Sequence, residues 1–130
     1  MIDIEAQIFT KVVEALPNTY VAGVYEPVPP MFPAVYITEV DNSVWRNGIS
    51  SSEVENYAVI MYEVNVYSNV KNRKKTECRE IANTVDEVLK GLNFTRMSLN
   101  PVPNLADSTI YRIVARYRAV VGQDETLYRR

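Results

Sequence analysis

The feature that most constrains this fold is a change of hydrophobic period between residues 56 and 92. The first part, Tyr57–Ser68, is rich in β-branched and aromatic residues and alternates between two sides as a strand does. After a polar break at residues 69–72, apolar residues recur at helical spacing and form one stripe. The stripe consists of Cys78, Ile81, Ala82, Val85, Val88, Leu89 and Leu92. Because each element is apolar on one side only, laying this helix on the sheet of this strand removes both apolar faces from water.

The remaining elements predict one α+β domain over residues 1–130. A second apolar stripe predicts a helix over residues 3–16, with Asp3 as its N-cap and Pro17 after its end. Gly91 is expected to end the other helix in the left-handed conformation. Further strands are predicted over residues 20–25, 34–40, 94–97, 108–121 and 126–129. We therefore expect an antiparallel or mixed sheet of about four to five strands, with the two helices packed on one face.

Three segments predict connections between these elements. Residues 26–33 contain four prolines, which favour an extended surface connector or, less favoured inside a domain, a ligand for a proline-reading domain. Residues 41–55 are polar and predict a long loop, in which Trp45 either contacts a partner or folds back on the sheet. Residues 98–104 predict a second rigid connector.

Composition argues against several kinds of chemistry. The chain has no histidine and a single cysteine, Cys78, so no histidine-based triad, histidine metal site or internal disulfide is available. The carboxylate pairs are too generic to predict a metal site, and the four glycines lie too far apart for a phosphate-binding loop. We expect no enzyme activity, no cofactor and no metal, and we expect Cys78 to be a buried apolar residue.

The charge pattern limits the partners. The net charge of −2 offers no global attraction to nucleic acid or to an anionic membrane, and no apolar run reaches the about 20 residues of a membrane helix. Lys71, Arg73, Lys74 and Lys75 cluster at the start of the second helix. This cluster is either a solvated helix start, where an Arg73–Glu77 pair offsets part of the unfavourable dipole, or a contact for an acidic surface or a nucleic-acid backbone.

The more informative cations are Arg112, Arg116 and Arg118, which alternation places together on one side of the strand over residues 108–121. Cations in such positions need water or acidic partners, and Glu63 supplies one if its strand is a neighbour. Otherwise this side of the sheet faces solvent or another subunit.

Four stretches of the chain carry a family resemblance. They are Phe32-Pro33-Ala34-Val35-Tyr36-Ile37, the segment Leu92-Asn93-Phe94-Thr95-Arg96-Met97-Ser98-Leu99-Asn100-Pro101-Val102-Pro103-Asn104, the segment Ile110-Tyr111-Arg112-Ile113-Val114-Ala115-Arg116-Tyr117-Arg118-Ala119-Val120, and the ending Leu127-Tyr128-Arg129-Arg130. Together with the strand-then-helix order at residues 57–92, they resemble tail-terminator or tail-completion proteins of long-tailed bacteriophages and prophages. The order of helices and strands resembles that family over nearly the whole chain. The amino-acid sequence itself resembles the family specifically only near the C-terminus.

The resemblance implies a structural protein without catalytic residues. It implies a sheet covered by two helices and assembly into a ring, commonly a hexamer, that caps the tail tube, stops its growth and offers a docking surface to the head connector. The implied partners are the chain itself, the tail tube protein and the head–tail connector, with neither a membrane nor sequence-specific nucleic acid among them. The implied location is the tail–head junction of the virion, after assembly in the bacterial cytoplasm. Two alternatives remain, a head-completion protein one layer nearer the capsid and an unrelated small α+β domain, nucleic-acid-binding or enzymatic, that uses the arginine side of the sheet.

From the sequence pattern we predict the interface residues. They are Trp45, Arg46 and Ile49 in the long loop and Arg112, Arg116 and Arg118 on the strand.

Overall fold

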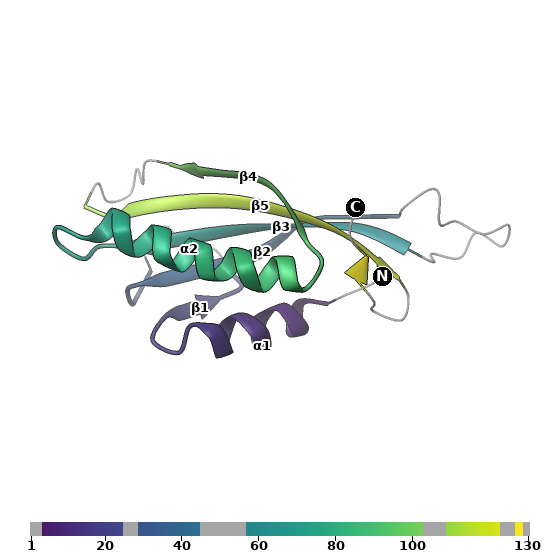
Figure 1. Ribbon diagram of the computed structural model, residues 1–130, viewed down its shortest axis with the longest axis horizontal. Coiled ribbons are helices and arrows are strands. Elements are labelled where there is room, and N and C mark those ends of the chain that lie inside the picture. The colour runs from purple at the N-terminus through teal and green to yellow at the C-terminus, as the bar shows by residue number, and fades with distance from the viewer. Residues whose placement is uncertain (1–3, 25–28, 45–56, 103–108, 123–126, 129–130) are drawn as a thin grey trace, which may run out of the picture.

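The computed structural model describes residues 4–24, 29–44, 57–102, 109–122 and 127–128 (Figure 1). In chain order the elements are α1 (Glu5–Ala15), β1 (Tyr20–Ala22), β2 (Ala34–Val44), β3 (Tyr57–Ser68), α2 (Lys74–Gly91), β4 (Thr95–Pro101), β5 (Tyr111–Gly122) and β6 (Leu127–Tyr128). The predicted α+β class is confirmed, since the described residues form two helices and one mixed sheet.

The sheet has the strand order β1-β2-β3-β5-β4, and the short β6 pairs with the end of β5. Only the β1–β2 pairing is parallel among the described strands, and the others are antiparallel. The long central strands β3 and β5 pair along their whole length, from Tyr57 opposite Gly122 to Ser68 opposite Tyr111. Both helices lie on the same face of the sheet, as Figure 1 shows.

The core lies between the helices and this face of the sheet. Alternate residues of β3 and β5 point into it, as their period predicts. The buried side chains of the core include Ala58, Ile60, Tyr62, Val64 and Val66 from β3, Ile113, Ala115, Tyr117, Ala119 and Val121 from β5, Ile8 and Val12 from α1, and Cys78, Ile81, Ala82, Val85 and Leu89 from α2. The predicted stripe of the second helix is therefore the surface that packs on the sheet.

Two strands are longer than their sequences predict. Residues 41–44, predicted as loop, continue β2 to Val44, and residues 98–101, predicted as connector, belong to β4. Backbone pairing with β3 and β5 outweighs the polar composition of these segments, and each of them follows a β-bulge in its strand. Pro101 is tolerated because β4 is the outermost strand of its side, where a missing N–H need not break a ladder.

Three predictions about helix ends are wrong. The N-cap of α1 is Ile4 rather than Asp3, which lies outside the described residues. Gly91 is the last residue of α2 and has no positive φ, because the chain makes its left-handed turn two residues later, at Asn93 with φ of 69°. Arg73 pairs with Glu80 at 3.4 Å rather than with Glu77, whose carboxylate accepts a hydrogen bond of 2.6 Å from Ser68.

Cys78 is buried in the core, as predicted. Its Sγ lies 3.3 Å from the carbonyl oxygen of Tyr111. Burial, followed by the charge of Glu77, raises the pKa of this thiol to about 12. Since the thiolate is the reactive form, we expect iodoacetamide at mildly alkaline pH to leave folded protein unlabelled and to modify the chain in guanidinium. Mass spectrometry checks this, and labelling of folded protein at the rate of the unfolded chain would contradict it.

Candidate functional site

The face of the sheet opposite the helices carries the predicted arginines of β5. Arg112 and Arg116 both project from this face, because residues two and four apart on a strand share a side. In the antiparallel register Arg112 lies opposite Tyr67 and Arg116 lies opposite Glu63 of β3. Glu63 can therefore act as the predicted acidic partner of the arginines, since its strand, β3, is the immediate neighbour of β5.

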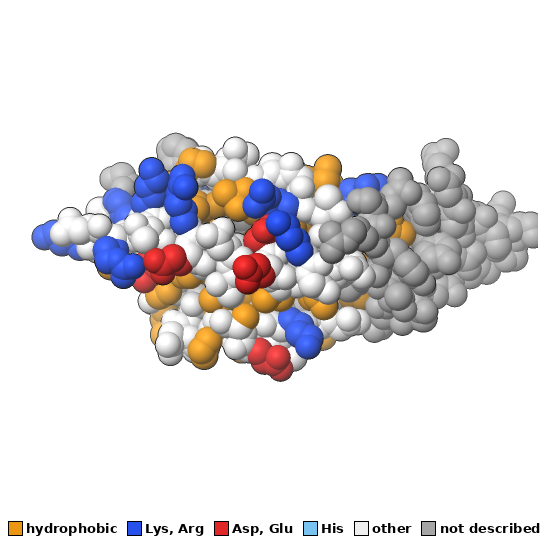
Figure 2. All heavy atoms as spheres, viewed as in Figure 1, with side chains coloured by type: hydrophobic (Ala, Val, Ile, Leu, Met, Phe, Trp, Pro, Cys, Tyr) orange, Lys and Arg blue, Asp and Glu red, His pale blue; other side chains and the backbone are white. Residues whose placement is uncertain are grey.

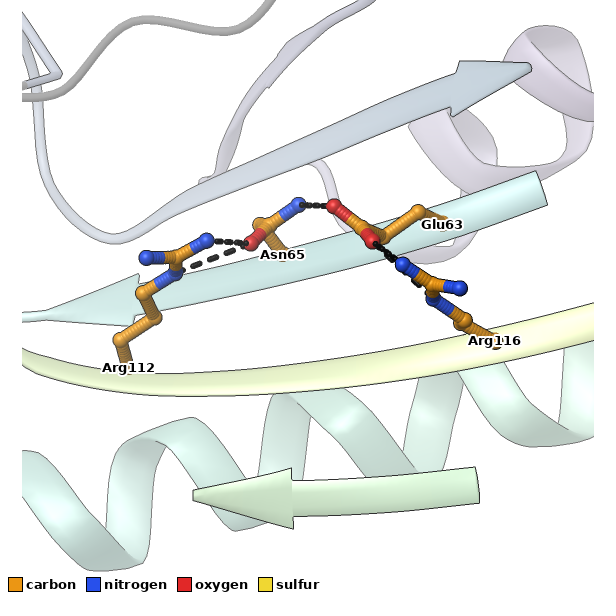
Figure 3. Close-up of polar contacts among 4 residues, drawn as sticks. All are labelled: Glu63, Asn65, Arg112 and Arg116. Atoms are coloured by element: carbon orange, nitrogen blue, oxygen red, sulfur yellow. Dashed lines mark hydrogen bonds and ion pairs between the residues drawn. The ribbon is translucent and has the colours of Figure 1, made fainter. Parts of the chain in front are cut away.

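Four side chains of β3 and β5 form one hydrogen-bonded row, which we call the arginine row (Figure 3). Its members, in order along the face, are Arg112, Asn65, Glu63 and Arg116. Two nitrogens of Arg112, Nε and Nη2, donate to Oδ1 of Asn65 at 2.9 and 2.7 Å. The amide nitrogen of Asn65 donates to Oε1 of Glu63 at 3.2 Å. The same two nitrogens of Arg116 donate to Oε2 of Glu63 at 3.1 and 2.9 Å.

Burial along the arginine row is uneven. Asn65 is only 1% exposed, whereas the side chain of Arg116 is 51% exposed. An ion pair this open contributes about 0 to 1 kcal/mol to folding, so the main effect of Glu63 on Arg116 is to fix the direction of the guanidinium. The buried Asn65 anchors the row within the fold, and Arg116 leaves part of its guanidinium open to solvent.

Arg112 also touches an aromatic cluster on the same face. Its guanidinium lies over the ring of Tyr67 at 5.7 Å from the centroid, within the range of cation–π attraction. The ring of Tyr67 in turn lies 5.5 Å from that of Tyr36, and both tyrosines are fully buried. Tyr20 and Phe32 pack against this cluster from outside it. The arginine row therefore rests on a rigid aromatic base, which limits the rotamers open to Arg112.

The structure brings together only part of the predicted interface. Arg118 lies on the same face as Arg116, opposite Met61, and is half-buried, but no ion pair joins it to the arginine row. Trp45, Arg46 and Ile49 lie outside the described residues. The candidate site among the described residues is thus the arginine row with Arg118 beside it.

The cationic start of α2 is a separate surface. Nζ of Lys74 donates to the carbonyl oxygen of Thr109 at 3.2 Å, and Arg73 is held by Glu80. Lys71 and Lys75 are exposed and border the same open hollow. Two of the four cations are therefore already engaged within the fold, and two face solvent.

On the helix side of the sheet, Asp86 is a buried carboxylate that the sequence analysis did not identify. Its Oδ1 accepts a hydrogen bond of 2.7 Å from the hydroxyl of Tyr117, and its Oδ2 lies 2.9 Å from Nζ of Lys90. Arg96 of β4 adds a contact of 3.5 Å. Burial acts to raise the pKa of Asp86, but the hydrogen bonds from Lys90 and Tyr117 and the charges of Arg96 and Lys90 outweigh it and lower the pKa. This cluster joins α2 to β4 and β5 and has a structural role.

Within the described ranges, no group of three or more histidine, cysteine, aspartate or glutamate side chains is placed to hold a metal ion. In the same part of the chain, neither helix has the length and apolar character needed to cross a bilayer. Comparison with protein-family models and with curated proteins gives no match.

Proposed function

We propose that this chain is a structural protein of the tail–head junction of a long-tailed phage or prophage. In this role copies of the chain form a ring, commonly a hexamer, that caps the tail tube, ends its polymerisation and gives the head connector a surface to dock on. The proposed role is non-enzymatic, and its partners are further copies of the chain, the tail tube protein and the connector. The proposed location is the virion, after assembly in the host cytoplasm.

The observation that carries this proposal is the arginine row on the face of the sheet opposite the two helices. Two arginines are held in fixed directions by Asn65 and Glu63, and the outer one remains half exposed. A cation that is oriented before binding loses less conformational entropy when it meets a carboxylate on a partner. The sequence segments that resemble tail-terminator proteins supply β4 and β5, and β5 carries both arginines.

The layout of the fold also supports the proposal. The resemblance implies a sheet covered by two helices, and both helices of this chain lie on one face. Among the described residues no helix lies on the opposite face, which can therefore contact other subunits. A head-completion protein would use such a face in the same way. The tail-terminator and head-completion roles differ only in whether the ring sits on the tail tube or one layer nearer the capsid.

A nucleic-acid-binding role is the second candidate, and the exposed Lys71 and Lys75 at the start of α2 are what favours it. The engagement of Arg116 by Glu63 argues against it, because the carboxylate offsets the charge that a phosphate would meet. Titration of duplex DNA binding against salt separates the candidates. A DNA-binding protein would lose affinity steeply as salt rises, whereas we expect weak binding throughout.

We expect the double substitution Arg116→Gln, Arg118→Gln to weaken self-association and binding to tail tubes, while the free energy of unfolding changes by less than about 1 kcal/mol. Stability should change little because both side chains reach solvent. Assembly should weaken because the substitutions remove two positive charges that this face offers to a partner. Light scattering at micromolar concentration, beside chemical denaturation, measures both effects.

The matched control is Lys71→Gln, Lys75→Gln, which removes the same charge from the start of α2. If the control weakens assembly and the arginine variant does not, the interface has been assigned to the wrong surface. If the control abolishes DNA binding that the wild type shows at physiological salt, the second candidate replaces the first.

A further inference from the structure

The sheet has two open edges with opposite chemistry. On one side β4 is outermost, and no described strand pairs with its outer edge. On the other side β1 pairs with Ala34–Tyr36 only, so within the described residues the rest of β2 has no strand beyond it. Open strand edges readily accept another strand or another subunit.

The basic edge consists of Arg96 and Met97 of β4 and Arg79 of α2. Met97 is the extra residue of a β-bulge between Arg96 and Ser98, and it is 55% exposed. Arg79 and Arg96 border a hollow of about 220 Å³ between α2 and β4, and the floor of this hollow includes the apolar side chain of Leu99. Figure 2 shows hydrophobic side chains between Lys and Arg side chains on this part of the surface.

Arg79 and Arg96 differ in how they are held. Arg96 contacts Asp86 at 3.5 Å, yet its side chain remains 42% exposed. Arg79 is exposed, and among the residues that the structure describes it has no ion pair. The basic edge thus presents an exposed methionine beside two cations.

The acidic edge consists of Glu39, Val40 and Asp41 of β2. Val40 is the extra residue of a β-bulge between Glu39 and Asp41, and it is 44% exposed. Glu39 accepts a hydrogen bond from the amide of Asn42, and the hydroxyl of Ser43 donates one hydrogen bond that the two carboxylate oxygens of Asp41 share. Both donors are neutral, so these bonds bring no positive charge to either carboxylate. This edge repeats the pattern of the basic edge, an exposed apolar bulge residue beside charged ones, with the charge reversed.

We propose that copies of this chain join edge to edge, with the basic edge of one copy against the acidic edge of the next. Met97 then packs against Val40, and Arg79 and Arg96 meet the acidic edge, where Glu39 lies on the same helix side of the sheet as Arg96 and Asp41 lies on the opposite side. This inference rests on the proposed ring and names the surfaces through which its subunits meet.

The charges decide between the two ways in which identical subunits can pair. Two basic edges repel each other, as do two acidic edges, so a two-fold symmetric contact through either edge is disfavoured. A basic edge against an acidic edge is a head-to-tail contact, which leaves one free edge of each kind and continues until a ring closes. The bulges interrupt the regular ladder at both edges, so the contact depends on side chains, which limits open-ended sheet growth.

Disulfide cross-linking between Val40→Cys and Met97→Cys tests the contact. Each single variant is purified, and the two are mixed under mild oxidation. We expect the mixture to form a covalent dimer at a yield roughly tenfold above that of either variant alone, because only the mixture places one cysteine on each edge. The buried Cys78 stays in place, since its burial and raised pKa keep it out of the reaction.

The controls keep the result specific to these edges. Val13→Cys, on the exposed side of α1 with 49% exposure, replaces Val40→Cys in a parallel mixture and should give only the background yield. Adding Glu39→Lys and Asp41→Lys to the Val40→Cys chain should lower its yield with Met97→Cys severalfold, and Arg79→Glu on the Met97→Cys chain should restore part of it.

A yield from Val40→Cys with Met97→Cys no higher than from the Val13→Cys mixture would overturn the proposed contact. Light scattering of the wild-type chain separates this failure from failure of the ring. Self-association without the cross-link would mean that the ring uses other surfaces. Absence of both self-association and the cross-link would overturn the contact and also remove support from the proposed function.

Discussion

Replacing Asp86 with alanine is expected to lower the free energy of unfolding by about 2 to 3 kcal/mol. The hydroxyl of Tyr117, a residue only 1% exposed, donates to Asp86 at 2.7 Å and would lose its acceptor inside the core. A buried hydroxyl without a partner carries the full cost of its desolvation. Lys90 and Arg96 would lose an ion pair as well, but both are about half exposed and contribute less. Urea denaturation followed by circular dichroism measures the change.

Two variants make this expectation specific. Glu87→Ala removes a neighbouring exposed carboxylate and should change stability by less than about 0.5 kcal/mol. Adding Tyr117→Phe to Asp86→Ala removes the stranded hydroxyl and should recover part of the loss. If Asp86→Ala lowers the free energy of unfolding no more than Glu87→Ala does, the cluster around Asp86 does not hold α2 to the sheet.

The same carboxylate gives the protein a pH dependence with a definite sign. The pKa of Asp86 in the fold is lower than its ordinary value of 3.8. A group with a lowered pKa stabilises the fold above its unfolded pKa, and this stability is lost as pH falls through the folded pKa. We therefore expect the wild type to lose stability below about pH 4 by more than Asp86→Asn does. Equal acid sensitivity of the two proteins would mean that other carboxylates dominate.

Asn65→Ala is expected to lower the free energy of unfolding by about 2 to 3 kcal/mol and to disorder the side chains of the arginine row. Asn65 is 1% exposed and accepts two hydrogen bonds from Arg112, at 2.9 and 2.7 Å. Hydrogen bonds from a charged donor exceed neutral ones in strength, and the substitution also leaves a small cavity. The link from Asn65 to Glu63 is lost at the same time, so Glu63 and Arg116 become freer to rotate.

The control for this variant is Asn69→Ala, just after β3, where the side chain is exposed. Denaturation of both variants gives the stability effect, and light scattering well below their melting temperatures gives the assembly effect. We expect Asn65→Ala to weaken self-association while still folded and Asn69→Ala to leave it unchanged. If folded Asn65→Ala self-associates as the wild type does, self-association does not require an ordered arginine row.

The sequence predicts the elements whose period is strong. β3 begins and ends where alternation places it, and the stripe of α2 is the surface that packs on the sheet. The sequence also names Glu63 as an acidic partner for the arginines if its strand is a neighbour, and the register meets that condition by setting Glu63 opposite Arg116. These features depend on local spacing, which a sequence displays directly.

The features that the sequence does not predict depend on tertiary partners. Residues 41–44 and 98–101 look like loops by composition, and only their backbone pairing makes them strand. Asn65 is a polar residue whose burial becomes visible once the register sets it near Arg112. Asp86 carries one readable signal, since it stands four residues after Ala82, beside the apolar stripe, but its partner Tyr117 is far away in the chain. The predicted sites at Trp45, Arg46 and Ile49 remain predictions.

Electron microscopy of tail tubes shows whether this chain caps a tube and ends its growth. Under the proposed function, the genome that encodes this chain also encodes a tail tube protein. That tube protein is polymerised alone and in the presence of the chain, and tube lengths and tube ends are recorded. We expect shorter tubes with a ring at one end when the chain is present, and we expect Arg116→Gln, Arg118→Gln to reduce the number of capped ends. Tubes with bare ends and an unchanged length distribution would contradict the proposed function.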